Sequence, residues 1–334
     1  MVADSGMVSV SAHGERSRSF RRRGPRALQG WTSGDALFRK VCTAFGLAIV
    51  ALLALLLYEL ARGSSLSLSR FGFGFAFEKV WDPVAEKFGA ATFIYGTMVT
   101  SVIALLVAVP LGVGIAIFLV EMAPPAVGNI IGFLVELLAA IPSIVYGLWG
   151  LFVLAPLVRD HVAPFLHATL GFLPFFSGES HGVGMLTAGL VLSIMVLPFI
   201  AAVSRDVLAA VPQPLREGSL ALGATKWETI WGVVLPYGRT GIGGSVILAL
   251  GRALGETMAV TMVIGNTPQI VLSLFEPGYT MSSVIANEYS EASGPLYLSS
   301  LTELGLLLFI ATFAVNGTAR ALIWRMAHGP GGRA

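Results

Sequence analysis

The chain consists of long apolar blocks separated by shorter polar segments. Six blocks are long enough to cross a bilayer, because about 20 helical residues rising ~1.5 Å each cover the ~30 Å hydrocarbon core. These blocks are residues 41–60, 92–119, 130–155, 183–203, 242–265 and 298–323. The pattern predicts an all-α, polytopic membrane protein with six transmembrane helices.

The polar segments give a first division of the chain. The expected parts are a basic, disordered cytoplasmic tail (1–40), the first transmembrane helix (41–60), an outer aromatic-rich loop (61–91), a membrane core (92–325) with a long loop at 204–241, and a cytoplasmic tail (326–334). The alternation of phenylalanine and glycine in the outer loop is typical of a membrane interface, which we favour over a docking surface.

Composition agrees with the hydrophobic pattern. Of the 334 residues, 55% are hydrophobic and 12% are charged, which excludes an ordinary soluble domain. The net charge of +2 says little, but eight of the 21 Lys and Arg residues lie in 1–40 and four in 204–241. The positive-inside rule therefore predicts that both termini and this loop are cytoplasmic. The basic tail is best explained as a topology anchor rather than a nucleic-acid arm or targeting peptide.

The cytoplasmic loop contains a hairpin, residues 216–236, that reads REGSLALGATKWETIWGVVLP. A first short helix is expected from Pro214 to Gly223, where a left-handed residue can end it. Thr225 and Glu228 have the spacing of a capping box that starts a second helix, which Pro236 is expected to end. One apolar stripe is expected on this second helix: Trp227, Ile230, Trp231 and Val234.

The hairpin resembles the coupling-loop signature of ABC importer permeases, E-A-A, x3, G, x9, I-x-L-P. Gly218 and Ser219 stand in place of the two alanines, and Val233 replaces the isoleucine. The resemblance implies that the hairpin inserts into a groove of a separate ATPase subunit. The alternative is an amphipathic hairpin that lies on lipid headgroups. The residues expected to couple are Glu217, Gly218, Ser219, Gly223, Trp227, Val233, Leu235 and Pro236.

The fifth apolar block carries two charges. Within GRALGETMAVTMVIGN, residues 251–266, Arg252 and Glu256 are four apart and are expected on one face of a continuous helix. An arginine at mid-bilayer costs about 2.5–3.5 kcal/mol on insertion scales, which disfavours a lipid-facing position. The pair is therefore either a buried salt bridge that fixes the helix or part of a polar path.

The second alternative has a specific chemistry. A guanidinium offers forked donors to the edge of an oxyanion and keeps its proton. An adjacent carboxylate repels a fully ionised anion but accepts a hydrogen bond from a protonated oxygen. Such a pair favours hydrogen phosphate over sulfate, because a site rejects a ligand that leaves its polar group unpaired.

Three strings resemble the PstC-type permeases of bacterial phosphate importers: GRALGETMAV in the fifth block, FIYGT before the second, and AAIPSIVYGLWG in the third. The resemblance covers roughly residues 70–325. It implies a type I ABC importer permease fold, alternating access, and a transport-linked arginine and glutamate at Arg252 and Glu256. It also implies a companion permease, two ATPase subunits and an extracytoplasmic phosphate-binding protein in a bacterial inner membrane.

Other chemistry is not indicated. The sequence has no G-x-x-x-x-G-K-[ST] loop, so ATP-Mg is expected in the partner ATPase and no cofactor in this chain. No catalytic constellation is apparent, which disfavours a membrane-embedded enzyme. His161, His167 and His181, all in an expected second outer loop at 156–182, lack metal-site spacing, and Cys42 is the only cysteine. A molybdate or sulfate permease and a non-transporting sensor subunit stay open as alternatives.

Overall fold

The computed structural model describes residues 32–328, so most of the expected tail at 1–40 and the end of the tail at 326–334 lie outside the described residues. The chain divides into a unit of residues 1–55 and a unit of residues 56–334. Helix α1 (Thr32–Gly63) supplies the described part of the first unit and begins well before residue 41. Its side chains from residue 34 to residue 55 are nearly all exposed, as expected of a helix that faces lipid.

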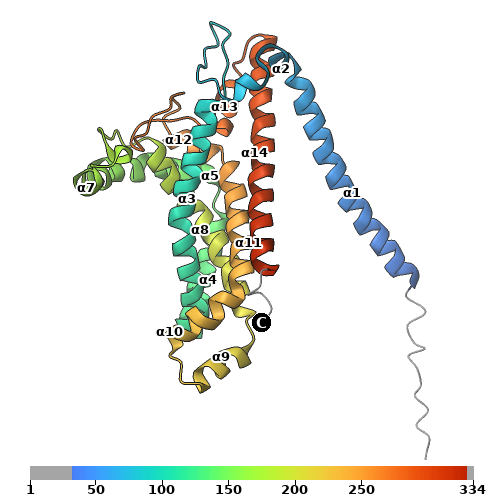
Figure 1. The fold of residues 1–334 in the computed structure, drawn as a ribbon, viewed down its shortest axis with the longest axis vertical. Coiled ribbons are helices and arrows are strands. Elements are labelled where there is room, and N and C mark those ends of the chain that lie inside the picture. Colours follow the sequence, from blue (N-terminus) through green and yellow to red (C-terminus); the bar gives the residue numbers. More distant parts are fainter. Residues whose placement is uncertain (1–31, 329–334) are drawn as a thin grey trace, which may run out of the picture. The chain divides into compact units, whose positions relative to one another are not determined.

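The described chain is helical, with one isolated β-bridge between Asp82 and Lys87, so the all-α prediction is confirmed. In the second unit, the long helices α3, α8, α11 and α14 run side by side along the long axis (Figure 1). Within residues 32–328, six helices are long and apolar enough to cross a membrane. Their bounds are Gly34–Gly63, Ala91–Met122, Ser143–Leu170, Met185–Ala209, Lys226–Leu254 and Pro295–Ala321.

The centre of the second unit is the contact between α3 (Ala91–Ile117) and α8 (Met185–Ala209). Small residues recur at every fourth position of α3 and are all buried. They are Gly96, Thr100, Ala104, Ala108, Gly112 and Ala116. Such a stripe lets two helix backbones approach closely, which is how helices associate within a membrane. The approach is tight at Gly112, where an added Cβ would lie 2.9 Å from Ile200 Cγ2.

Gly96 gives the first testable prediction. A Cβ at this position would lie 2.2 Å from the carbonyl oxygen of Tyr279, a backbone atom that cannot rotate away. We expect Gly96→Ala to destabilise the protein by about 1–3 kcal/mol, as overpacking usually does. A lower thermal midpoint in detergent would report it. The control is Gly114→Ala on the same helix, where nothing lies within 4 Å. Equal midpoints for the two variants would contradict the close contact.

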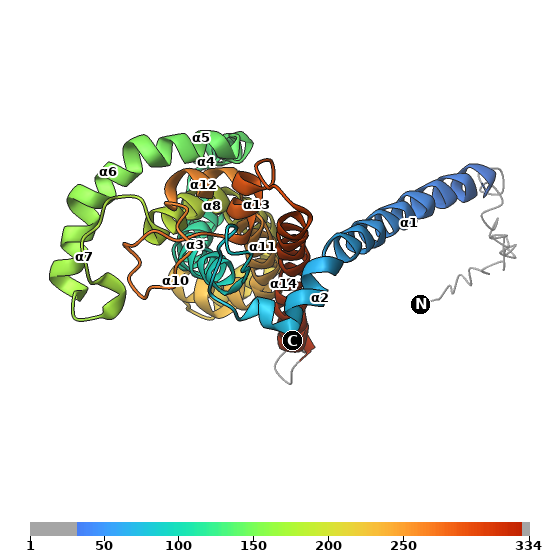
Figure 2. The ribbon, with the colours of Figure 1, turned by 90° about the horizontal axis from the view of Figure 1, so that it is seen from above.

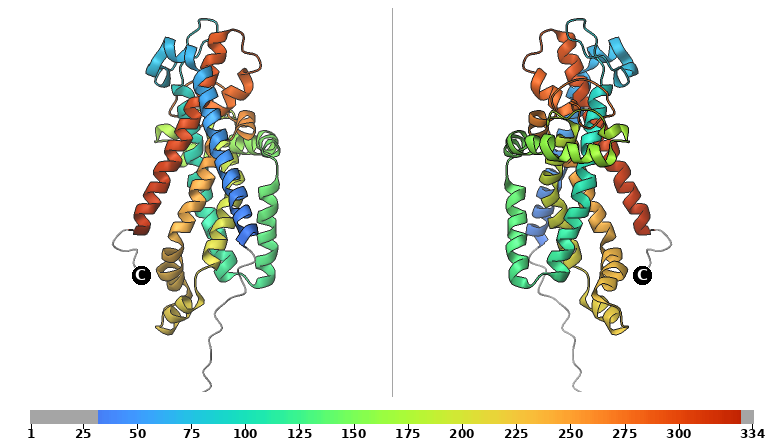
Figure 3. Two further views of the ribbon diagram at one scale, coloured as in Figure 1. Left: turned by 90° about the vertical axis from the view of Figure 1, so that its right-hand side faces the viewer. Right: turned by 90° about the vertical axis from the view of Figure 1, so that its left-hand side faces the viewer.

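The third apolar block is not one straight span, and the prediction for 130–155 was wrong. Helix α4 (Pro125–Ala140) ends before Ile141 and Pro142, whose ψ angles of 129° and 140° are extended. The cause is local, because proline disfavours helical geometry at the residue before it. A new helical stretch then starts with α5 (Ser143–Trp149) and turns across the bundle (Figure 3).

This crosswise stretch continues far into the region expected to be the outer loop 156–182. After α5 come η3 (Gly150–Leu154), α6 (Ala155–Leu157), η4 (Val158–Val162) and α7 (Ala163–Leu170). Seen from above, α5, α6 and α7 form an arm around one side of the bundle (Figure 2). The loop prediction was therefore wrong up to Leu170, because the prolines at 156 and 164 lie in first turns of helical segments, where a missing N–H is tolerated.

The end of the second hairpin helix also differs from the prediction. Helix α10 (Lys226–Thr229) passes through a π-turn, η6 (Ile230–Val234), directly into α11 (Leu235–Leu254). Pro236 therefore does not end the helix. It lies in the first turn of α11, immediately after the π-turn, and this widened turn accommodates the missing hydrogen bond. The hairpin is thus continuous with the fifth span.

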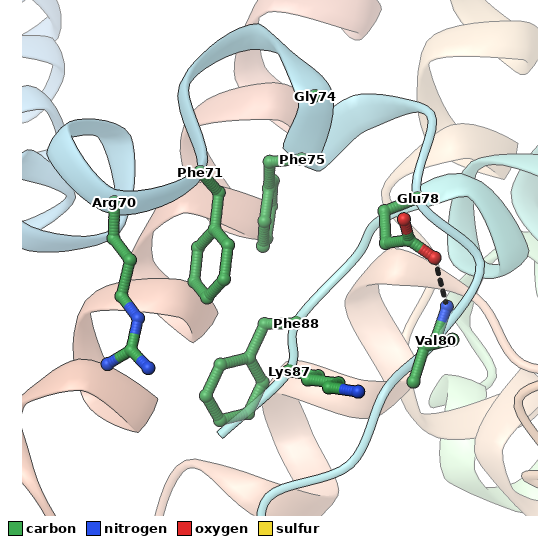
Figure 4. A pocket seen from close by; sticks show the side chains of 8 residues that line it. All are labelled: Arg70, Phe71, Gly74, Phe75, Glu78, Val80, Lys87 and Phe88. Atoms are coloured by element: carbon green, nitrogen blue, oxygen red, sulfur yellow. Dashed lines mark hydrogen bonds between the residues drawn. The ribbon is translucent and has the colours of Figure 1, made fainter. Parts of the chain in front are cut away.

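The end of the second unit opposite the hairpin is closed by α2 (Ser65–Phe71), η1 (Gly72–Ala76), α13 (Met281–Glu288) and the start of α14 (Pro295–His328). The aromatic residues expected at a lipid interface divide here into two sets. Phe75 and Phe88 are 1% exposed, whereas Phe73 is 95% exposed. In Figure 4 the rings of Phe71, Phe75 and Phe88 face one another beside a pocket of about 460 Å³.

Candidate transport and coupling sites

The fifth span is broken at its two charged residues, and the prediction of one helix over 251–266 was wrong. Helix α11 ends at Leu254, Gly255 forms its C-cap, and a new helix, α12 (Met258–Val263), begins after Thr257. Gly255 has φ −95° and ψ 1°, which other residues also adopt, so the end of α11 does not depend on a left-handed glycine. Irregular backbone at membrane depth is tolerated where protein or a water-filled cavity surrounds it.

Arg252 lies in the last turn of α11, where a cation interacts favourably with the helix dipole. Its guanidinium carbon is 4.7 Å from the centroid of the Phe199 ring, which belongs to α8. The contact is a cation–π interaction between the guanidinium and the ring. Within residues 32–328 no carboxylate pairs with Arg252. The edge of the guanidinium, with its forked donors, is available to an anion.

Glu256 lies in the break, and its side chain bonds the first turn of α12. Its Oε1 accepts a hydrogen bond from the backbone N–H of Ala259 at 3.2 Å. Its backbone carbonyl accepts one from Ser282 Oγ, in α13, at 2.6 Å. Among the described residues Glu256 makes no ion pair with Arg252, so the salt bridge that the sequence left open is not formed. The break separates the two charges that a continuous helix would have aligned.

The coupling hairpin has the predicted first half. Helix α9 (Gln213–Ala221) is followed by Gly223 with φ +90°, the left-handed residue expected at its end. Glu217 and Gly218 are exposed, whereas Ser219 is half-buried and its hydroxyl lies 2.9 Å from that of Thr229. The hairpin bend is thus held by a short bond between its two helices.

The second half begins with the predicted capping box. The hydroxyl of Thr225 accepts from the backbone N–H of Glu228, and the Glu228 carboxylate accepts from the Thr225 N–H at 2.7 Å. The predicted single stripe is wrong, because its residues divide into two columns. Ile230 and Val234 are buried, but Trp227 and Trp231 are 58% and 57% exposed with ring centroids 5.7 Å apart.

The remaining coupling residues lie at the start of the span. Val233 and Leu235 are half-buried, and Leu235 packs on an apolar cluster at the inner ends of α3 and α8. Pro236 is exposed. The exposed residues of the hairpin therefore include Glu217, Gly218, Gly223, Pro236 and the two tryptophans, while Ile230 and Val234 pack toward the bundle.

Two contacts were not found by sequence reasoning. Phe199, which stacks on Arg252, looks like any other apolar residue of the fourth span. Glu121, at the hairpin end of the second span, binds Arg216 of α9 at 2.9 Å. The available signal was a lone carboxylate at the edge of an apolar block, but its partner is 95 residues away. Nothing local to either residue indicates the pair.

A bundle of membrane-length helices with an exposed amphipathic hairpin and a charged break in one span defines an integral membrane permease. The fold agrees: a bacterial alginate ABC transporter crystallised with its alginate-bound periplasmic protein is similar at a TM-score of 0.59 and 17% identity. That likeness covers 89% of this chain and 98% of the other. Residues 108–327 match the family described as binding-protein-dependent transport system inner membrane component.

Closer relatives are known by sequence. The phosphate transport system permease protein PstC of Mesorhizobium japonicum is 50% identical over 87% of this chain and 90% of its own. PstC of Haemophilus influenzae is 51% identical over 89% of this chain and 95% of its own. The chain belongs to the PstC-type permeases within the family of binding-protein-dependent inner membrane components. It is a transporter subunit rather than a catalytic one, and its place is the inner membrane.

Proposed function

We propose that this chain is the transmembrane subunit of an ATP-driven importer of inorganic phosphate, and that phosphate passes the break between α11 and α12. The observation that carries the proposal is Arg252, a permanent cation in a membrane span whose guanidinium edge has no carboxylate partner within residues 32–328. A charge at this depth is costly unless it serves a polar path. We take phosphate as the substrate because the relatives are named as phosphate transport permeases.

The proposed site discriminates by protonation. The Phe199 ring supports one face of the guanidinium, and the edge donates two parallel hydrogen bonds to phosphate oxygens. Glu256 is oriented by the Ala259 N–H and accepts the remaining proton of hydrogen phosphate. Sulfate has no proton at neutral pH, so it would leave the carboxylate unpaired and is rejected.

The proposed complex contains this chain, a companion permease that supplies the other half of the path, two ATPase subunits and an extracytoplasmic phosphate-binding protein. ATP-Mg binds to the ATPases, and this chain needs no cofactor of its own. The exposed face of the hairpin, with Trp227 and Trp231, inserts into a groove of one ATPase. Closure of the ATPases then moves the hairpin and tilts the spans, which gives alternating access.

The proposed orientation follows from charge. The basic N-terminal segment, the hairpin and the C-terminus are placed in the cytoplasm, and the cap formed by α2, η1 and α13 is placed outside. The hairpin and the cap lie at opposite ends of the bundle (Figure 1), as this orientation requires.

The test is uptake of radiolabelled phosphate by proteoliposomes that contain the complete complex, its binding protein and internal ATP. We expect ATP-dependent uptake that excess sulfate and molybdate leave unchanged, because neither offers the proton that Glu256 accepts. Competition by either anion would contradict the proposed selection by protonation and admit another oxyanion to the path. A complex that hydrolyses ATP but takes up none of the three would indicate a non-transporting sensor and overturn the proposal.

A further inference from the structure

Helix α9 is attached to the membrane bundle almost without apolar packing. None of its residues is buried, and its leucines at positions 215 and 220 are 42% and 48% exposed. The nearby apolar cluster is built from the inner ends of α3 and α8 and the start of α11, and it includes no residue of α9. Polar contacts therefore have to hold this helix in place.

Arg216 makes the principal polar contact. Its Nε donates to Glu121 Oε1 at 2.9 Å, and its two terminal nitrogens donate to the carbonyl oxygens of Leu208 and Val211. Glu121 lies in η2 (Phe118–Met122), which continues α3. Leu208 lies in the last turn of α8, and Val211 lies just beyond α8, in the bend before α9. One guanidinium thus joins α9 to two spans at once, a use of its planar fork that a lysine does not reproduce.

The pair is shielded from water. The side chains of Arg216 and Glu121 are 13% and 9% exposed, unlike the other four ion pairs of the described residues, in each of which at least one partner is 49% exposed or more. Partly shielded charges attract each other more strongly than fully exposed ones, and separating them would leave each without its partner. The contact therefore resists being pulled apart.

The second polar link of α9 is weaker and connects it to α10 rather than to α3 or α8. Ser219 bonds Thr229 at 2.9 Å, which connects α9 to the continuous helix α10–α11 through one neutral hydrogen bond. Charge-assisted bonds are roughly twice as strong as neutral ones, and Arg216 makes three bonds with charge. A cavity of about 570 Å³, lined by Glu121, Arg216 and Lys226 among others, lies next to the ion pair, so α9 is not packed solidly against α10.

We propose that the Arg216–Glu121 ion pair is the link through which displacement of α9 is delivered to α3 and α8. Helix α8 carries Phe199, the ring on which Arg252 is stacked, so the link connects the coupling hairpin with the proposed path. This inference rests on the proposed function, in which the ATPases move the hairpin and the hairpin moves the spans. Arg216 and Glu121 are positioning residues, since neither is near the break in the fifth span.

The test is the number of phosphate ions moved per ATP hydrolysed by the complete complex in proteoliposomes. In Glu121→Gln and Arg216→Gln we expect ATP hydrolysis to persist, because the exposed face of the hairpin is unchanged, and transport per ATP to fall about tenfold, within the usual range of coupling between sites. The matched control is Glu136→Gln, which weakens the more exposed Arg205–Glu136 pair on the same side of the bundle. An unchanged ratio in both variants would overturn the proposal.

A second measurement does not depend on transport or on the substrate. In a Cys42→Ser background, which has no cysteine, spin labels at positions 222 and 122 report the distance between the end of α9 and the end of η2; the native side chains there are 90% and 55% exposed. With the native Arg216–Glu121 pair, we expect a narrow distribution of distances that ATP does not change. In Glu121→Gln we expect a broader distribution. If the native complex does not transport phosphate, the proposed function is wrong. The distance between the two labels still tests whether the Arg216–Glu121 pair holds α9 to the end of α3. A distance equally narrow in both proteins would contradict it.

Discussion

Replacement of Arg252 by glutamine is expected to lower phosphate uptake about 100-fold or more. The reason is that phosphate in the proposed path would lose the cation that pairs with it, and loss of one partner of such a charge pair costs about 2–5 kcal/mol or more. Glutamine keeps a polar end on a shorter side chain but has neither the charge nor the fork that holds two oxygens. The guanidinium forms no ion pair within residues 32–328, so its loss should leave the fold intact.

The measurement is uptake of labelled phosphate by the assembled complex, with copurification of the ATPase and companion permease as the check on assembly. Arg252→Lys should keep part of the uptake, since it retains the charge but not the bidentate geometry. Arg70→Gln, which breaks an exposed ion pair with Glu86 at the outer end, should transport normally. Normal uptake by Arg252→Gln in an assembled complex would remove this residue from the path.

The double substitution Trp227→Ala, Trp231→Ala is expected to weaken binding of the ATPase by about 100-fold, because exposed tryptophans that enter a partner's pocket are the usual hot spots of an interface. Both rings are more than half exposed in this chain and stack edge to face, so they form one apolar knob. Neither ring belongs to the buried clusters of the bundle, and the fold should therefore survive.

The corresponding measurement is the affinity of the purified ATPase subunit for the detergent-solubilised permease pair. Phe73→Ala provides the control, because Phe73 is 95% exposed but lies in η1 at the opposite end of the bundle. Unchanged affinity in the double variant would favour the alternative in which the hairpin rests on lipid headgroups. In that case the same variant should bind anionic vesicles less well.

Local signals in the sequence were reliable where they involve only neighbours along the chain. The apolar blocks at 92–119, 183–203 and 298–323 became α3, α8 and α14 with small shifts at their ends. The capping box at Thr225 and Glu228 formed, and Gly223 took a left-handed conformation. Each of these features depends on residues within one or two helical turns, so the sequence contains all that is needed to predict it.

The breaks in the helices were harder to predict, because the hydrophobicity of a block does not indicate whether its helix is continuous. Pro142 ended α4, whereas Pro110 lies inside α3, Pro198 inside α8, and Pro236 in the first turn of α11. The difference is tertiary: neighbouring helices and a π-turn accommodate the missing hydrogen bond at the last three sites. Likewise, the fifth block stops at Gly255, where α13 supplies Ser282 to bond the freed carbonyl of Glu256.

By itself, the sequence determined that this protein is a helical membrane protein with a capped polar hairpin and a charged fifth span, because hydrophobic length, capping and motif spacing are local properties. Only the tertiary structure decided which charges meet. Arg252 lies against Phe199 rather than Glu256, and Arg216 reaches Glu121 across 95 residues. Such contacts depend on how helices distant in sequence pack side by side, and the closely packed stripe of small residues on α3 fixes that arrangement.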